Sequence, residues 1–444
     1  MIRFGFGKED ITPKRGIGLC GYFEPRYNRG AYDPLTVKAA LFESNGTVSG
    51  IVSYDLCLMG RSLVEKIKSA VKNGGFPFAE NLLYSCTHTH TGPYTSAVFS
   101  DSADQEYLQS VIDKTVKAVK NAFEGLAEAK LRKGCAENSS LAFNRRFWMT
   151  DGTVLTNPGK LNPAIVKPEG GIDSSIPFLI VEQEGMDRLI IANISNHTDT
   201  IGEDLVSADW PGRMEREIQN HYGYDIAVIT LIGCQGNINH FNVKNNVNQT
   251  CYAEACRIGK GYAASIISML YAAEEMKADS IRVESVEFDA PFYHVTDEEY
   301  NEAKKIVQEI GEISATSAND LTSEGIAAGN LYVKKFFAQR VLDNREKQIA
   351  NDRKEYMTAL KFGDELGIVT LPAEPFVEIG LAIKENSRFA TTMVAALTQG
   401  EIGYVGLEES YGRGGGYETR PGYGSPAHNL APVLVETATK LINK

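Results

Sequence analysis

The chain has 444 residues, of which 43% are hydrophobic and 23% are charged, and its formal net charge at pH 7 is -12. These proportions are ordinary for a soluble globular protein. The acidic balance argues against nucleic acid as a partner and against docking on an anionic membrane, because both need a basic surface.

Apolar β-branched runs alternate with amphipathic stretches along the chain, which is typical of an α/β protein. Taken in chain order, buried strands are expected at 81–86, 188–195, 226–233, 366–371 and 391–397. Helices are expected at 104–126, 211–220, 254–275, 297–313, 375–385 and 432–442. The sequence contains no repeat and no low-complexity linker, so we expect one α/β unit spanning 1–444.

The helix at 297–313 has the clearest sequence signature. Thr296 and Glu299 have the spacing of a capping box, and an apolar face follows at the helical period. The surrounding segment, 295–355, is richer in charge and in helix than the remainder, which favours a small helical subdomain or cap.

The sequence shows neither a targeting segment nor a disulfide framework, and we therefore expect a cytoplasmic protein. The sequence "MIRFGFGKEDITPKRG" has no apolar segment long enough for a signal peptide, and no later run reaches the roughly 18 apolar residues of a membrane span. Seven irregularly spaced cysteines do not suggest a disulfide framework. We therefore expect no stable membrane association, and the oligomeric state stays open.

Polar and metal-capable side chains follow five of the expected strands. Listed in chain order, these groups are His88 with His90, His197 with Asp199, Asn237 with Asn239 and His240, Glu374, and Tyr404. Sites in open α/β sheets form beyond the carboxyl ends of the strands. Because polar side chains follow five strands of one chain, we predict a functional site at the carboxyl ends of these strands.

The segment "YSCTHTHTGP" contains two of the seven histidines of the chain, His88 and His90. Residues two apart in an extended chain point to the same face, so both could serve one site. The alternative is a pair of hydrogen-bonded histidines at the end of a strand. His197 has the same two interpretations.

Glu374 precedes Pro375, which is expected to open the helix at 375–385, so ordinary helix capping is one explanation for it. The other is metal binding, because two histidines and a glutamate with an open position form a common catalytic zinc set. Zinc would lower the pKa of a bound water and polarise a carbonyl.

Several motifs resemble those of the neutral/alkaline, non-lysosomal ceramidase family, in its N-terminal catalytic domain. They are "GFGKEDITP", "YDPLTVKAALFES", "THTHTGP", "NRR" (144–146), "NHTDT", "SADWPG", "LPAE" and "GYV" followed by "GGGYE". The resemblance extends over nearly the whole chain. It implies a fold in which β-sheets are layered between helices.

The resemblance also implies roles for particular residues. It places Zn²⁺ on four side chains, which are His88, His197, Glu374 and Tyr404. It places three hydrogen-bond donors around the reacting carbonyl, which are His90, Arg145 and Tyr417. Such donors stabilise the negative charge that develops on the carbonyl oxygen.

The chain departs from the family pattern at "GNINHF" (236–241), where Asn239 stands in place of the family's serine and Asn237 in place of its aspartate. Asparagine is a poor nucleophile and cannot act as a general base. Zinc-bound water is then the expected nucleophile, with Asn239 or His240 orienting the substrate. We also expect the protein to lack the secretion signal and the C-terminal immunoglobulin-like domain of the family.

We therefore expect a zinc-dependent hydrolase that acts on an amide, ester or glycosidic bond of a small soluble substrate. One alternative is a ceramidase that uses metal-activated water on N-acyl sphingoid lipids. Another is a catalytically inactive protein that keeps the metal site for ligand binding.

Overall fold

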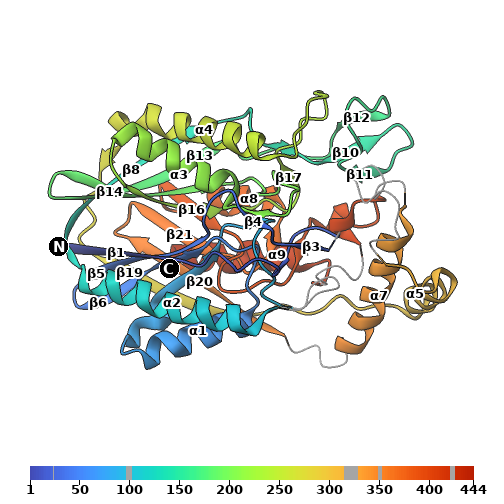
Figure 1. Cartoon of the computed structure of the whole chain (residues 1–444), viewed down its shortest axis with the longest axis horizontal. Helices are drawn as coiled ribbons and strands as arrows, with labels where there is room; N and C mark the ends of the chain where they lie inside the picture. The colour runs from blue at the N-terminus through green and yellow to red at the C-terminus, as the bar shows by residue number, and fades with distance from the viewer. Residues whose placement is uncertain (24, 97–102, 315–328, 349–352, 421–425) are drawn as a thin grey trace.

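The structure is a computed structural model that describes residues 1–444 apart from Glu24 and the segments 97–102, 315–328, 349–352 and 421–425. Two β-sheets form its centre, and helices cover their outer faces (Figure 1). This is the predicted arrangement of sheets layered between helices, and the α/β class is confirmed.

The larger sheet has nine strands within the described residues. Its order is β16 (Ala227–Ile232), β14 (Met186–Ile194), β13 (Ser175–Gln183), β8 (Ala127–Glu137), β1 (Ile2–Asp10), β5 (Thr36–Ser44), β6 (Thr47–Tyr54) and β7 (Leu82–Cys86), with β18 (Glu274–Glu275) beside β8. The pairs β14–β16 and β6–β7 are parallel. Within each pair, the two strands therefore end at the same side of the sheet.

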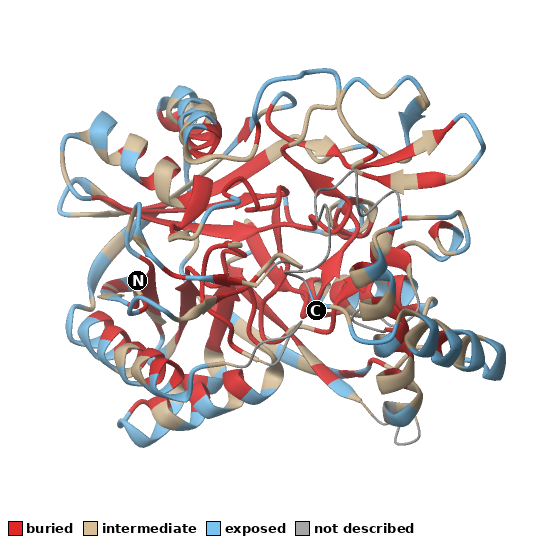
Figure 2. Cartoon of the chain, turned by 45° about the vertical axis from the view of Figure 1, so that its right-hand side comes forward, coloured by how far each residue is buried: buried red, intermediate tan, exposed pale blue. Residues whose placement is uncertain are grey.

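The smaller sheet has the order β19 (Ile281–Asp289), β20 (Lys354–Phe362), β21 (Leu366–Thr370) and β23 (Thr391–Ala395). The pair β21–β23 is parallel. Apolar side chains of the two sheets pack into one buried cluster, with Phe4 and Phe42 from the large sheet and Leu360 and Phe362 from the small one. Figure 2 shows buried residues concentrated through this centre.

Three pairs of helices cover the two sheets. The pair α1 (Arg61–Asn73) and α2 (Gln105–Glu124) packs beside β1 and β5, and α3 (Asp209–Tyr222) with α4 (Tyr252–Met269) packs beside β8, β14 and β16. The pair α8 (Val377–Glu385) and α9 (Leu430–Asn443) covers the small sheet. No helix in the described part of the chain is long and apolar enough to cross a membrane.

Short strands shape the loops at one end of the sandwich. They are β2 (Gly18–Leu19), β3 (Arg26–Tyr27), β4 (Gly30–Ala31), β9 (Phe143–Asn144), β10 (Arg146–Met149), β11 (Val154–Thr156), β12 (Ile165–Pro168), β15 (Leu205–Val206), β17 (Ile238–Asn239), β22 (Glu374–Pro375) and β24 (Tyr404–Val405). Two of them, β22 and β24, pair with each other in parallel and belong to the candidate site.

Two glycines of β1 let α2 lie directly on the large sheet. A Cβ atom on Gly5 would collide with the backbone carbonyl of Ala122, and one on Gly7 with that of Ala118. Both glycines face the helix because residues two apart in a strand share a face. Helix α2 thus packs backbone to backbone on the strand.

The helices α5 (Asp297–Ile310) and α7 (Leu331–Lys347) lie together at the edge of the molecule (Figure 1). The capping box of Thr296 and Glu299 at the start of α5 is confirmed, with both reciprocal hydrogen bonds present. Apolar residues of the two helices, including Ala303 and Val341, pack against each other. Whether this pair acts as a cap stays a prediction.

Several expected helix boundaries differ by two or more residues, including the helix expected at 297–313, which ends at Ile310. Two of the differences have a reason in the structure. The helix expected from Pro375 begins at Val377, because Glu374 and Pro375 form β22 and the side chain of Asn237 accepts a hydrogen bond from the Val377 N–H. The helix expected to run to 275 ends at Met269, because the chain turns and pairs with β8 as β18.

Candidate active site

The ends of four strands meet at one point of the sandwich. The backbone of the segment after β23 bonds to both sheets: the Cys86 N–H donates to the Leu397 carbonyl, and the Ala396 N–H donates to the Ile232 carbonyl. The Gly233 N–H in turn donates to the Ile194 carbonyl. These contacts fix the residues that follow β7, β14, β16 and β23 against one another.

Three potential metal ligands converge at this point. The Glu374 Oε2 atom lies 3.1 Å from His88 Nε2 and 3.4 Å from His197 Nε2. Metal–ligand bonds of about 2.0–2.1 Å in a tetrahedral site place neighbouring ligand atoms roughly 3.3 Å apart, so these separations suit a zinc ion. All three side chains are buried, and among the described residues Glu374 Oε2 has no partner with hydrogen-bond geometry. A buried carboxylate oxygen without a hydrogen-bond donor fits the role of a metal ligand.

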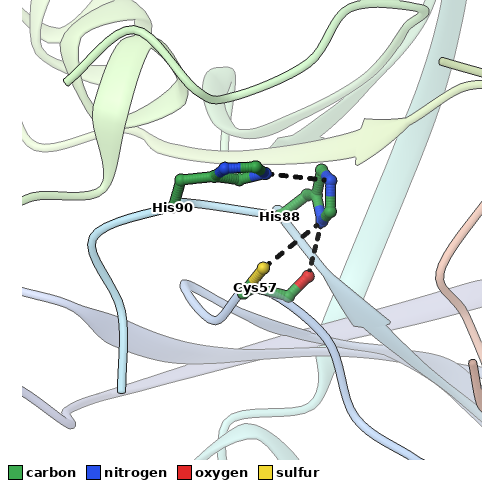
Figure 3. A group of neighbouring side chains, drawn as sticks. All are labelled: Cys57, His88 and His90. Carbon is green, nitrogen blue, oxygen red and sulfur yellow. Dashed lines mark hydrogen bonds between the residues drawn. The ribbon is translucent and has the colours of Figure 1, made fainter. Parts of the chain in front are cut away.

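The two histidines are held in the tautomer that a metal requires. His88 Nδ1 faces the Cys57 carbonyl oxygen (Figure 3), at a distance of 2.8 Å, and His197 Nδ1 lies 3.0 Å from the Gln235 carbonyl oxygen. A carbonyl only accepts hydrogen bonds, so each Nδ1 carries the hydrogen. The Nε2 lone pairs are then free to face Glu374, as in metal sites whose histidines are oriented by backbone carbonyls.

The side chains of the two histidines of "THTH" lie close together, but through a backbone conformation that the sequence did not predict. His88 has a left-handed backbone with φ of 64°, so the expectation of an extended chain with both side chains on one face is wrong. The His90 N–H donates to the Thr198 carbonyl, and His90 Nε2 comes within 3.3 Å of His88 Nε2 (Figure 3). Gly21 has a φ of 108° and lies where a Cβ atom would strike the His90 ring.

Burial and charge act together on these groups. Burial would raise the pKa of Glu374, but His88 and His197 outweigh it and hold that pKa well below its ordinary value. Burial lowers the pKa of His88, while Glu374 raises it, and the net pKa is raised. Burial and His88 hold the pKa of His90 well below its ordinary value. The site therefore keeps Glu374 ionised and His90 neutral.

Arg145 places a fixed positive charge beside the three ligands. Its side chain is buried, Nη1 lies 3.3 Å from His197 Nε2, and Nη2 donates to the Gly236 carbonyl at 2.7 Å. Its guanidinium carbon lies 5.4 Å from the ring centre of Tyr404 and 5.2 Å from that of Tyr417. The arginine and the two tyrosines thus surround one side of the cluster.

Glu418 holds Arg145 in this position, and the sequence interpretation gave it no role. Its carboxylate lies 2.9 Å from Arg145 Nε and 3.0 Å from Arg146 Nη1, and it accepts a hydrogen bond from Thr156 at 2.6 Å. Glu418 directly follows Tyr417 in the chain, so one turn supplies both the phenol and the counter-charge. Two adjacent arginines in "NRR" were the available signal that a buried acid would be needed.

The pairing of β22 with β24 places Tyr404 beside Glu374. The two residues are direct partners in the parallel register, and the Glu374 N–H donates to the Gly403 carbonyl at 3.0 Å. The ring centres of Tyr404 and Tyr417 are 5.9 Å apart. Burial is the main reason that the pKa of Tyr417 is raised, so this phenol stays protonated and can donate a hydrogen bond.

Asn239 lies fully buried in β17 with its amide engaged by the protein. Its Nδ2 donates to Asn157 Oδ1 at 3.1 Å, and its Oδ1 accepts from the Phe241 N–H at 3.1 Å. Asn237 accepts from the Val377 N–H and donates to Glu378 at 2.9 Å, which fixes the start of α8. The structure thus uses both asparagines to hold the loop after β16.

These features define a class: an α/β sandwich with two histidines, a glutamate and a fixed arginine at its strand ends. Comparison of the sequence with models of protein families and with curated proteins finds no match. The structure is similar to the crystal structure of neutral ceramidase from Pseudomonas aeruginosa, with a TM-score of 0.75 and 17% identity over 99% of this chain and 74% of that chain. A ceramidase complexed with C2 gives a TM-score of 0.74, with the same identity and coverage. The chain therefore has a neutral-ceramidase-like fold.

Proposed function

We propose that the protein is a zinc-dependent hydrolase that cleaves an amide, ester or glycosidic bond of a small soluble substrate. The observation that carries the proposal is the convergence of His88 Nε2, His197 Nε2 and Glu374 Oε2 on one buried point. Two histidines and a carboxylate are a common catalytic zinc set. Tyr404, the strand partner of Glu374, is the proposed fourth ligand.

Zinc in this site would supply a water of lowered pKa and a Lewis acid for the substrate carbonyl. In this proposal the chain's own residues bind and orient the substrate around that position. Arg145 is held by Glu418 and donates to the carbonyl oxygen as negative charge develops on it. His90 and Tyr417 are proposed to add two neutral hydrogen-bond donors to the carbonyl oxygen. A preorganised set of donors stabilises the transition state more than water does, because the donors need no reorientation.

The proposal assigns no nucleophile to the loop after β16. Asn239 uses its amide to bond Asn157 and the backbone of Phe241, and an amide offers neither a nucleophilic hydroxyl nor a general base. Its proposed contribution is to keep the loop in place beside the substrate. His197 depends on that loop, because Nδ1 lies 2.9 Å from the Ile238 carbonyl oxygen.

Hydrolysis of 4-nitrophenyl esters and 4-nitroanilides by the zinc-loaded protein tests the proposal. Glu374→Gln, which removes one ligand charge, is expected to lower kcat/KM by roughly 100-fold or more. Asn239→Ala is expected to lower it by no more than roughly tenfold, since the residue only supports the loop. Full activity in Glu374→Gln together with its loss in Asn239→Ala would contradict the proposal.

Ceramide is the second candidate substrate, because two structures to which this fold is similar are named as ceramidases. Incubation with a fluorescent short-chain ceramide distinguishes the two candidates. Release of the labelled fatty acid, lost in Glu374→Gln, would favour ceramide. Turnover of the small esters or anilides without fatty-acid release would favour the soluble substrate.

A further inference from the structure

An ion pair between Asp199 and His240 lies next to the candidate metal ligands and has no role in the proposed chemistry so far. His240 is fully buried, with Nδ1 3.0 Å from Asp199 Oδ1 and Nε2 2.6 Å from the Gln249 carbonyl oxygen. Both partners only accept hydrogen bonds, so both ring nitrogens carry a hydrogen. His240 is therefore an imidazolium, and it fixes one oxygen of the Asp199 carboxylate.

The second oxygen of Asp199 is unused. Among the described residues, the side-chain hydrogen bond of Asp199 engages Oδ1 alone, and the side chain keeps 12% of its surface exposed. The backbone around it is fixed on two sides. The Tyr22 hydroxyl donates to the Asp199 carbonyl at 2.8 Å, and the His90 N–H donates to the neighbouring Thr198 carbonyl.

Asp199 lies close enough to the proposed catalytic groups for its charge to act on His90 and His197. Burial is the main cause of the raised pKa of Tyr417, and the Asp199 charge adds to it. The Tyr22 ring, whose hydroxyl holds the Asp199 backbone, packs edge-on against the His90 ring at 5.4 Å between centres. Asp199 Oδ2 is thus a carboxylate oxygen beside the site to which no donor of the described residues is bonded.

We propose that Asp199, positioned by His240, forms a subsite that accepts a hydrogen bond from a hydroxyl group of the substrate. A carboxylate oxygen accepts only, so the group it receives must be a donor. The imidazolium of His240 beside the carboxylate repels an ammonium group, whereas a neutral hydroxyl meets no such repulsion. The inference rests on the proposed function and deepens it, because it assigns a hydroxylated substrate to the same site.

Calorimetry with two hydroxamates on the zinc-loaded protein tests this subsite. Acetohydroxamic acid reports on the metal site alone, and glycolohydroxamic acid adds one hydroxyl group. The wild type is expected to bind glycolohydroxamic acid roughly tenfold more tightly, as for a hydrogen bond to a charged group. Asp199→Asn should abolish this preference and change acetohydroxamic acid binding by less than about twofold. Asp113→Asn, on the exposed face of α2, is the matched control and should keep the preference.

His240→Gln tests the positioning role. It leaves the carboxylate in place but removes the imidazolium, so the preference for the hydroxylated ligand should shrink while acetohydroxamic acid binding persists. A role of His240 in folding alone would weaken both ligands together.

The outcomes separate the subsite from the proposed function. Equal binding of both hydroxamates by the wild type would overturn the subsite and leave the metal site standing. If the wild type binds neither hydroxamate, the result contradicts the metal site. The subsite is then tested in the metal-free protein with ligands that do not need a metal. For that case, glycolamide and acetamide are titrated into protein with ¹⁵N-labelled histidine. Shifts of the His240 ring signals by glycolamide, absent with acetamide and in Asp199→Asn, support the subsite, and identical responses to both amides overturn it.

Discussion

Replacing Glu418 with glutamine tests whether the buried charge network behind the site is essential to the fold. The Glu418 side chain is fully buried, and the side chains of Arg145 and Arg146 are each only 1% exposed. Glu418→Gln keeps the shape of the side chain but leaves Arg145 without its only carboxylate partner among the described residues. Arg146 keeps a second carboxylate, Glu169.

The expected loss follows from removing one partner of a buried pair, which costs about 3–5 kcal/mol. The entropy of unfolding is about 2.1 cal/mol/K per residue, so 444 residues give roughly 0.9 kcal/mol/K. A loss of about 4 kcal/mol divided by that entropy lowers Tm by roughly 4 °C. The paired guanidinium also loses its fixed position, so kcat/KM should fall as well.

Differential scanning calorimetry of the wild type, Glu418→Gln and Glu436→Gln measures this effect. Glu436 is an exposed glutamate of α9 paired with Lys440, and its substitution should leave Tm unchanged within error. An unchanged Tm in Glu418→Gln would refute the reasoning, because it would mean that Arg145 does not need its buried counter-charge.

Three further predictions concern pH, helix capping and metal. The pKa of His240 is raised above its unfolded value, since Asp199 outweighs burial, and the pKa of Asp199 is lowered chiefly by His240 in spite of burial. Their mutual stabilisation is therefore present above the unfolded aspartate pKa of about 4 and is lost as pH rises through the raised pKa of His240. Denaturant titrations give the unfolding free energies of the wild type and of His240→Gln. Their difference should be largest near pH 5–6 and smaller at pH 9. A difference that grows with pH would contradict the ion pair. Asn237→Ala removes the side chain that accepts from the Val377 N–H, and it should cost about 1 kcal/mol, or roughly 1 °C in Tm, by the same measurements. Zinc at 100 times its Kd should raise the stability of the metal-free protein by about 2.7 kcal/mol, or roughly 3 °C in Tm, and identical melting with zinc and with a chelator would argue against a folded metal site.

The sequence predicted the strands that carry the site better than the rest of the fold. The runs ending before His88, His197 and Glu374 are continuous apolar segments, because their strands are buried on both faces. Such runs stand out in a sequence. Parallel strands β14 and β16, and β21 and β23, then bring their polar endings together.

Other features depend on contacts between distant segments, which no local pattern encodes. The pairing of β22 with β24 sets Tyr404 beside Glu374, yet each strand has only two residues. The left-handed backbone of His88 is imposed where its N–H bonds to the Leu56 carbonyl. The role of Glu418 requires knowing that two arginines are buried together. These are tertiary effects, and they decide the geometry of the site.

The metal content of the purified protein tests the central claim most directly. Mass spectrometry should be applied to the wild type, to His88→Ala and His197→Ala, and to His221→Ala as a control on the exposed end of α3. The expected result is about one zinc per chain in the wild type and the control, and its loss in the other two variants. Absence of metal from the wild type after incubation with zinc, or its retention in both His88→Ala and His197→Ala, would contradict a metal centre at the strand ends.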